Sequence, residues 1–543
     1  MHIQKGMILF MFCVLIWTAF GQGDLDSVDY DVVIAGGRVI DPETHFDETA
    51  FVGIVGEKIQ TISSKPLLGK RMIDAQGLVV APGFIDTHVH QVHLMGYKLL
   101  LRDGVTSALE LELGVLGTKV AQWYASREGQ MPLNLGVTTS HELARSLVLD
   151  GAEGIDVTEA QNTRSAGNLW SVQRPSLEEA NQILSVLDEG LREGALGVGS
   201  TLGYMRTGVS AREMFEVQRL ASSYGRLTSV HFRSTPGTDT QEANGLQEVL
   251  ANAMVLDAPL IACHFNNPGW PLVHELLLRA REKGRNVWGE IYPYEAGSTS
   301  LNSEFLAPEI WEGELGFVYE ESVLDPVAGE FITLERYKEL METDPSRLVV
   351  IFKMPQEEVP QWLMLPGVSI GGDGMPIPPF DQSWDTPFEE LANTHPRTSG
   401  AHAKALRLGR EHQIPLMQLI SQLSYVSAKG LGDAGVTSMQ VRGRLQEGMV
   451  ADITIFDPET VTDQADFEVG TRPSMGIPYV LVSGKLVVDE GIALGNIFPG
   501  KAIRYDVREE GQHQDLDKKH WIQNHLILPL DFGGLAHLGE HSE

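Results

Sequence analysis

The sequence predicts an α/β protein: a (β/α)8 TIM-type barrel with a small β-sandwich domain formed from both ends of the chain. Eight short apolar runs alternate with helix-like stretches through the middle of the sequence. Short alternating strands punctuated by Gly and Pro occupy both ends. Acids and histidines recur where the apolar runs end, which is where barrel proteins carry their chemistry.

The expected barrel strands lie at residues 79–90, 105–112, 133–141, 195–201, 226–232, 259–265, 286–294 and 368–374. Between them stand helix-like stretches such as SLEEANQILSVLDEGLREG and SAREMFEVQRLASSYG, whose apolar residues recur at helical spacing. At 543 residues the chain exceeds the size that one core supports, so we expect a large domain and a smaller companion.

The domain boundaries follow from these patterns. Segments 22–78 and 435–505 share the style of DVVIAGGRVIDP and GRLQEGMVADITIFDP and are expected to form the composite β-sandwich. The barrel then spans 79–434. Acidic, Pro-rich sequence at 302–367 is too long for a bare loop and predicts an insertion, either a lid over the barrel mouth or an ornament. Residues 506–543 form a polar tail.

Residues 1–21 predict an export signal. Lys5 precedes an apolar stretch from Met7 to Phe20, and Gly21 follows as a small residue at the expected cleavage site. A membrane span needs about 20 apolar residues, so we expect a secreted or periplasmic protein, with a retained N-terminal anchor as the alternative. Cleavage would leave Cys263 as the one cysteine, which excludes an internal disulfide.

The net charge limits the kinds of molecule that the protein can bind. Lys and Arg number 41 against 73 Asp and Glu, giving a formal net charge of -32, which repels nucleic acid and anionic membranes. We expect a small-molecule substrate, no nucleic acid and no membrane contact beyond the export signal. The oligomeric state stays open.

The pattern of acids and histidines predicts a metal site. His88 and His90 in VVAPGFIDTHVH are two apart on a strand, so both imidazoles can face one ion. An HxH pair alone is weak evidence, but further candidate ligands also close apolar runs: Glu110, Glu112, His231, His264 and Asp373. Glu110 and Glu112 share a face among apolar neighbours, where a carboxylate pair is costly without a cation. An exposed strand edge is the alternative for this pair.

These motifs resemble the amidohydrolase superfamily, and most closely the D-aminoacylase (N-acyl-D-amino-acid deacylase) family, from about residue 30 to about residue 500. The resemblance is carried by APGFIDTHVH, DGVTSALELE, GALGVGST, SVHFR, IYPYEAGST, GGDG, HPRTSG and GRLQEGMVADITIFD. It implies that one or two divalent metal ions are held by His88, His90, His231, His264 and Asp373.

The remaining ligand departs from the family. Relatives place a cysteine near the end of strand two, where this chain has Leu113. Many members of the superfamily bridge two metals with a modified lysine, but no lysine occurs between Lys119 and Lys283. We therefore expect Glu112 to bridge two ions, with Glu110 as its substitute or behind it. Imidazole and carboxylate ligands suit Zn²⁺, with Mn²⁺ or another divalent ion as the alternative.

The resemblance also implies a mechanism. Asp373 is expected to act as general base toward a metal-bound water, and the resulting metal-bound hydroxide attacks an amide carbonyl. The protonated aspartate then passes its proton to the leaving amine. His141 in TTSHELAR is a candidate donor to the oxyanion, with a purely structural role as the alternative.

Four residues are expected to contact the substrate. Tyr292 and Ser298 in IYPYEAGST match family residues that hold it, and Arg397 in HPRTSG matches the arginine that grips its carboxylate in a bidentate pair. Asn266 stands where relatives have a lysine, so one cationic contact is missing at that position.

The leading hypothesis is a hydrolase that removes the acyl group from an N-acyl-(D-)amino acid. One alternative keeps the site but changes the substrate to a cyclic amide, as in a hydantoinase or dihydroorotase, or to a dipeptide. The YPYxAGST segment favours a linear substrate. A noncatalytic barrel scaffold is the alternative of another class, and retention of nearly all ligands argues against it. The residues do not set the substrate's stereochemistry or side chain.

Overall fold

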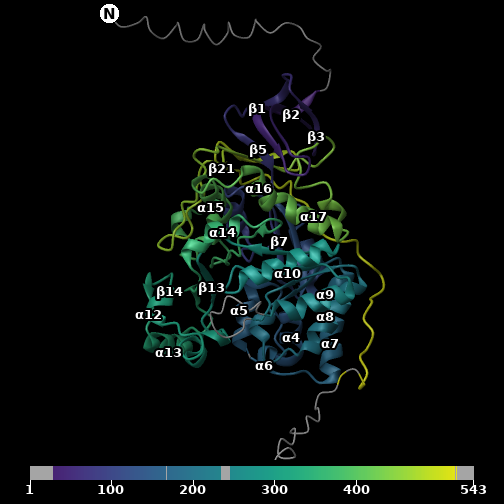
Figure 1. Ribbon diagram of the computed structural model, residues 1–543, viewed down its shortest axis with the longest axis vertical. Coiled ribbons are helices and arrows are strands. Elements are labelled where there is room, and N and C mark those ends of the chain that lie inside the picture. Colours follow the sequence, from purple (N-terminus) through teal and green to yellow (C-terminus); the bar gives the residue numbers. More distant parts are fainter. Residues whose placement is uncertain (1–28, 167, 234–244, 520, 522–543) are drawn as a thin grey trace, which may run out of the picture.

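The computed structural model describes residues 29–166, 168–233, 245–519 and 521, so the expected export signal lies outside the described residues. An eight-stranded parallel sheet forms a nearly closed barrel. A second sheet, built from both ends of the chain, lies at the top of Figure 1, and a third, smaller one flanks the barrel at the lower left. The predicted fold class is confirmed. Among the described residues no helix is long and apolar enough to cross a membrane.

The barrel strands follow one another around the sheet in sequence order. They are β6 (Phe84–Asp86), β7 (Val105–Val115), β8 (Asn134–Ser140), β9 (Gly197–Ser200), β10 (Leu227–Val230), β11 (Leu260–Ala262), β12 (Val287–Ile291) and β17 (Ser369–Ile370). Just past the ends of β6 and β17, the Asp373 N–H donates to the His88 carbonyl (2.7 Å) and the His90 N–H to the Gly374 carbonyl (2.9 Å). The barrel is therefore drawn together by residues of the expected metal site.

Helices follow most of the strands. They are α2 (Leu94–Arg102), α3 (Val120–Arg127), α4 (His141–Arg145), α5 (Val157–Ala166), α6 (Leu169–Val172), α7 (Leu177–Arg192), α8 (Ala211–Ser223), α9 (Leu246–Leu256), α10 (Trp270–Glu282), α14 (Val359–Leu363), α15 (Arg397–Glu411), α16 (Leu416–Ile420) and α17 (Val426–Asp433). Helix α7 begins at a capping box in which Ser176 and Glu179 satisfy each other's backbone N–H groups. It buries Ile183, Leu187 and Leu191, spaced four apart on one face.

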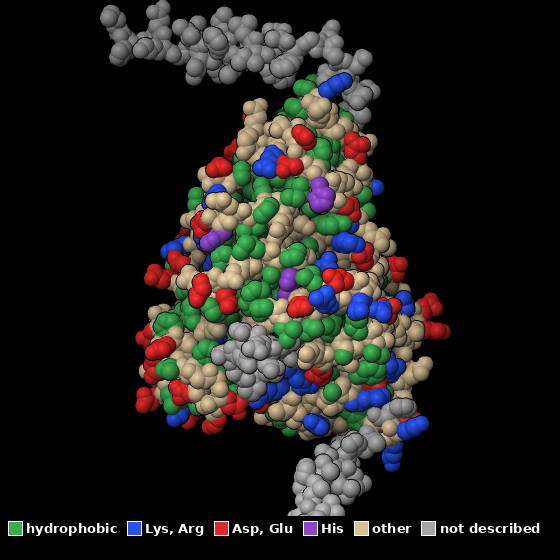
Figure 2. Space-filling model, viewed as in Figure 1, with side chains coloured by type: hydrophobic (Ala, Val, Ile, Leu, Met, Phe, Trp, Pro, Cys, Tyr) green, Lys and Arg blue, Asp and Glu red, His purple; other side chains and the backbone are tan. Residues whose placement is uncertain are grey.

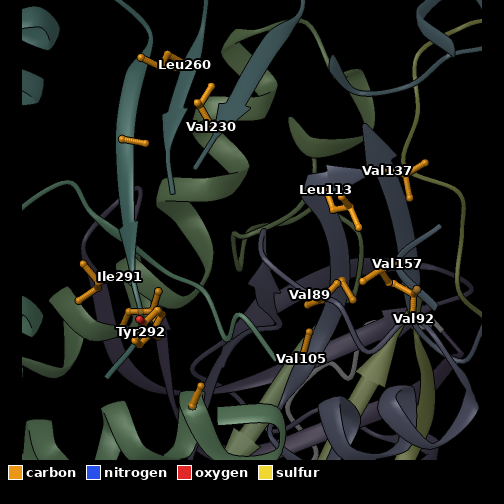
Figure 3. Packing of buried hydrophobic residues seen from close by; sticks show 14 of the residues in the cluster. Val89, Val92, Val105, Leu113, Val137, Val157, Val230, Leu260, Ile291 and Tyr292 are labelled. Carbon is orange, nitrogen blue, oxygen red and sulfur yellow. The ribbon is translucent and has the colours of Figure 1, made fainter. Parts of the chain in front are cut away.

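Aliphatic side chains from the strands fill the space around the barrel. Val105, Val137, Val230 and Leu260, on β7, β8, β10 and β11, are fully buried in one continuous core, and Figure 3 shows how they lie. Burying a side chain of this size contributes about 1.5–3 kcal/mol. Close packing of this kind fixes the strands, and hence the residues at their carboxyl ends.

The sheet formed by both ends of the chain contains nine strands. They are β1 (Tyr30–Asp41), β2 (Phe46–Val55), β3 (Lys58–Ser63), β4 (Gly69–Asp74), β5 (Val79–Pro82), β18 (Ile453–Phe456), β19 (Tyr479–Val482), β20 (Lys485–Asp489) and β21 (Ile492–Ala493). Its buried core mixes residues from both ends, such as Ile34 and Val52 with Ile453 and Leu481.

The expected first barrel strand, 79–90, divides between two sheets. Strand β5 pairs with β1 and β18 of the end sheet, and only β6 enters the barrel. The break falls at Gly83, where a Cβ atom would come within 2.3 Å of the Thr106 hydroxyl. Because both halves are equally apolar, periodicity alone does not locate this break.

The insertion is a small subdomain with its own core. Its sheet comprises β13 (Ala296–Ser300), β14 (Val323–Asp325), β15 (Glu330–Phe331) and β16 (Leu348–Phe352), with helices α11 (Pro308–Trp311), α12 (Tyr319–Ser322) and α13 (Leu334–Thr343). Trp311, Tyr319 and Val349 are buried in its centre. The first strand of this subdomain, β13, begins at Ala296, six residues before the expected boundary. Figure 2 shows acidic side chains over this subdomain and elsewhere on the same face, interspersed with basic ones.

Candidate metal centre and substrate pocket

Four imidazoles surround the carboxylate of Glu112. Its Oε1 lies 3.0 Å from Nδ1 of His231 and 2.9 Å from Nε2 of His264. Its Oε2 lies 3.3 Å from Nε2 of His88 and 3.3 Å from Nε2 of His90. Each carboxylate oxygen therefore faces one pair of histidines.

Asp373 approaches the same cluster from the end of β17, beside the end of β6. Its Oδ1 lies 3.4 Å from Nε2 of His88 and 3.3 Å from Nε2 of His90, and its Oδ2 lies 2.9 Å from Nη2 of Arg397. The backbone of Asp373 is left-handed (φ 49°), which costs a non-glycine residue about 1–2 kcal/mol. The hydrogen bond from its N–H to the His88 carbonyl holds it there. All six predicted ligands thus converge.

The arrangement fits one or two divalent cations. Among the described residues, four sets of potential ligand atoms lie within 4.8 Å of one another: His88, His90 and Glu112; Glu112, His231 and His264; His88, His264 and Asp373; and His88, Cys263 and Glu290. Nε2 of His88 is fully buried yet forms no hydrogen bond with the described residues. A buried polar atom of this kind needs a partner, and a metal ion supplies one. Because the first two sets share Glu112, its carboxylate is placed to bridge two ions.

The electrostatics agree with a cation site. Burial lowers the pKa of His88, but the carboxylates of Asp373, Glu290 and Glu112 outweigh this and raise it well above its ordinary value. Burial raises the pKa of Glu112, but His88 and hydrogen bonds from His231 and His264 bring it well below its ordinary value. The carboxylates are therefore ionised, and metal binding would have to displace protons from imidazoles.

Two further glutamates orient the histidines from behind. Oε2 of Glu110 lies 2.7 Å from Nδ1 of His90, and Oε1 of Glu290 is hydrogen-bonded to Nδ1 of His88. Such contacts fix which ring nitrogen faces the metal. Glu110 thus lies behind His90, whereas Glu112 faces all four imidazoles. Glu290 was not predicted, although it stands out in the sequence as a lone acid inside the apolar run VWGEIY.

A pocket opens above the cluster. Its polar lining includes His90, Glu112, His231, His264, Asp373 and Arg397, and its apolar lining includes Leu113, Val157, Phe305, Trp311, Leu315, Phe317, Leu348 and Ile351. Six of these apolar residues belong to the insertion, which therefore forms one wall of the pocket. It is a part of the site and not an ornament.

Three of the predicted substrate contacts line this pocket: Tyr292, Ser298 and Arg397. The Arg397 guanidinium lies 4.7 Å from the centre of the Tyr292 ring and is almost fully buried. Its Nη2 contacts Asp373, while its Nε and Nη1 have no hydrogen-bond partner among the described residues. Two buried donor nitrogens of one guanidinium thus lack a partner in the described part of the chain, and a guanidinium in this state favours an anion beside it.

Two predicted site residues lie elsewhere. Nδ1 of His141 is 2.9 Å from the Ser200 hydroxyl and Nε2 is 3.2 Å from Glu213, so both ring nitrogens are engaged within the fold and away from the pocket. This geometry favours the structural alternative over the catalytic role.

Asn266 is fully buried, donates to the Tyr292 carbonyl (3.2 Å) and does not line the pocket. The expectation rested on the position of a lysine in the related family. Here β11 ends at Ala262 and His264 has a positive φ of 26°, so the chain leaves the strand before Asn266. The neighbouring Asn267 lines the pocket instead.

Comparisons with known proteins agree with this geometry. No family model matches the chain. It is 28% identical over 496 residues to D-aminoacylase of Alcaligenes xylosoxydans xylosoxydans, covering 86% of this chain and 96% of that protein. It is 29% identical over 517 residues to N-acyl-D-glutamate deacylase of the same organism, covering 89% and 98%.

Solved structures show the same fold. The N-acyl-D-glutamate deacylase of Bordetella bronchiseptica, complexed with zinc and a phosphonate mimic of the tetrahedral intermediate, superposes with a TM-score of 0.69 at 24% identity, covering 88% of this chain and all of that one. L-hydantoinase of Arthrobacter aurescens gives a TM-score of 0.57 at 16% identity over the same share of this chain.

Fold and site together define a parallel (β/α)8 barrel with a cluster of candidate metal ligands at the carboxyl ends of its strands. The chain is similar to the D-aminoacylases over most of its length, and its predicted resemblance to them is confirmed. The cyclic-amide hydrolases are more distant in structure.

Proposed function

We propose that this protein hydrolyses the amide bond of an N-acyl-(D-)amino acid, with zinc as its metal. One observation carries the proposal: the Arg397 guanidinium, with two free N–H donors, contacts the same Asp373 whose other oxygen faces His88 and His90. In an N-acyl amino acid, the carboxylate is separated from the amide nitrogen by a single carbon. A carboxylate-binding group beside the metal ligands matches that spacing.

Each residue has a distinct task in this reaction. The chemistry supplied by a bound divalent ion is polarisation of the amide carbonyl and a lower pKa for a water molecule beside it. The carboxylate of Asp373 is ionised, because the charges of Arg397 and His88 lower its pKa against the effect of burial. It can therefore accept a proton from water at the cluster and return it to the leaving amine. The apolar residues of the insertion line the pocket beside this cluster.

Zinc is supported by the ligand set. Imidazole nitrogens and carboxylate oxygens are its common protein ligands, and the Bordetella bronchiseptica relative was solved with zinc. Export to the periplasm or the exterior is supported by the N-terminal sequence alone. Fractionation of cells expressing the full chain, with a variant lacking residues 1–21 as the control, tests it: recovery of both forms in the cytoplasm would contradict export.

The linear substrate is favoured over a hydantoin because a hydantoin ring offers no carboxylate to the free donors of Arg397. A substrate panel tests this choice. Zinc-loaded protein is assayed with matched N-acyl-D- and N-acyl-L-amino acids, a hydantoin and a dipeptide, and chelator-treated protein serves as control. We expect turnover of the N-acyl amino acids only and its loss on chelation. Turnover of the hydantoin alone, or none by metal-loaded protein, would overturn the proposal.

A further inference from the structure

The insertion places a lysine in the substrate pocket. Lys353 follows directly after β16, and its side chain lines the pocket together with Arg397, Asp373 and His231. It is half-buried and forms no hydrogen bond or ion pair with any described residue.

The other pocket cations already face anions. Arg164 donates to both carboxylate oxygens of Glu142, at 2.7 and 2.9 Å. Arg206 lies 3.7 Å from Glu304. Among the described Lys and Arg residues that line the pocket, Lys353 alone has no carboxylate within ion-pair distance.

The surroundings of Lys353 favour the binding of an anion. Asp373 attracts it, but that carboxylate already contacts Arg397 and the histidine cluster. Burial, and next the repulsion from Arg397, lower the pKa of Lys353 to about 8, so the amine is still mostly protonated at neutral pH. Two cations that repel each other across a partly desolvated pocket are both stabilised when one anion binds between them.

We propose that Lys353 binds the substrate carboxylate together with Arg397, so that the insertion supplies a cationic contact that position 266 does not provide. The proposal rests on the proposed function and names a recognition residue for it. Arg397 lines the pocket from the barrel side and has unpaired guanidinium nitrogens, and Lys353 lines it from the insertion. A carboxylate has two oxygens and can accept from both residues.

A comparison of two substrates isolates this contact. We would measure kcat and KM for an N-acyl amino acid and for its C-terminal carboxamide, using wild-type protein, Lys353→Met and Lys353→Arg. Lys353→Met should lower the ratio of kcat/KM for the acid to that for the amide by about 10-fold or more, mainly through KM. Lys353→Arg should restore most of the ratio because it keeps the positive charge.

Lys338→Met is the matched control, since Lys338 is exposed on α13 of the same subdomain. Thermal unfolding and metal content of each variant show whether the pocket is intact. If Lys353→Met turns over both substrates in the wild-type ratio, or loses both equally with its fold and metal retained, the inference is wrong while the proposed function stands. If wild-type protein hydrolyses neither substrate, the proposed function itself has failed.

Discussion

Replacing Glu112 by Gln tests the arrangement of the metal centre. The change keeps the size and one oxygen of the side chain but removes the negative charge that four imidazoles surround. Glu110→Gln is the matched comparison, because Glu110 lies two residues away on the same strand and contacts only one of those imidazoles, His90.

The two variants should differ widely in metal affinity. Two unit charges 4 Å apart attract each other by about 4 kcal/mol at an effective dielectric constant of about 20. A carboxylate directly beside divalent ions gains more, so Glu112→Gln should weaken metal binding by at least ~10³-fold. Glu110 only orients a ligand, and loss of such a contact costs about 10–100-fold.

Metal stoichiometry and turnover are the readouts. Each protein is stripped with a chelator, reconstituted with zinc, dialysed and analysed for bound metal and for kcat. We expect Glu112→Gln to lose one or both ions and nearly all turnover, and Glu110→Gln to regain both at higher zinc. The opposite ranking, with full metal and activity in Glu112→Gln, would refute the assignment of Glu112 as the shared ligand.

Three further predictions address neighbouring residues. Glu290→Gln should weaken zinc binding by about 10–100-fold, because Glu290 holds Nδ1 of His88; titration with a zinc indicator measures this. His141→Ala should lower the free energy of unfolding by about 2–4 kcal/mol through its lost contacts to Ser200 and Glu213, with unchanged metal content and kcat. The pKa of Lys353 is lowered to about 8, so its positive charge is lost as pH rises through that value. At pH values above this pKa, KM for an N-acyl amino acid should therefore increase.

Each of these predictions has a contradicting result. Unaltered zinc affinity in Glu290→Gln would mean that His88 is oriented by other contacts. A large fall in kcat for His141→Ala, with metal and fold retained, would restore the catalytic role that its contacts argue against. The pH effect has Lys353→Arg as its control, since arginine stays charged throughout. The same rise of KM in that variant would assign the titration to a different group.

The sequence predicted the barrel because its evidence was local and repeated. Each strand is a short apolar run, and each metal ligand closes such a run, so the rule that parallel strands present their carboxyl ends together places the ligands near one another. Two-residue spacing correctly put His88 beside His90. It also put Glu110 and Glu112 on one face, but it did not distinguish between them.

Two of the site residues that were predicted wrongly or not at all, Asn266 and Lys353, lie outside the barrel strands. Asn266 was expected at the pocket because relatives have a lysine at that position. Here β11 ends at Ala262, the backbone of His264 has a positive φ, and Asn267 lines the pocket instead of Asn266. Lys353 was missed because it comes from a segment outside the barrel repeat, and its position depends on how the subdomain docks. No periodicity within one strand carries that information.

Substrate recognition is therefore divided between two parts of the chain. The barrel supplies the metal ligands, and the same backbone segments that carry His88, His90 and Asp373 join its first and last strands by hydrogen bonds. Those residues are tied to the closure of the fold and have little freedom to change. Much of the pocket's apolar wall comes from the insertion, which has a separate core that includes Trp311. Substitutions there can alter the substrate without disturbing the barrel, so the insertion is where differences in acyl-group and side-chain preference are expected to arise.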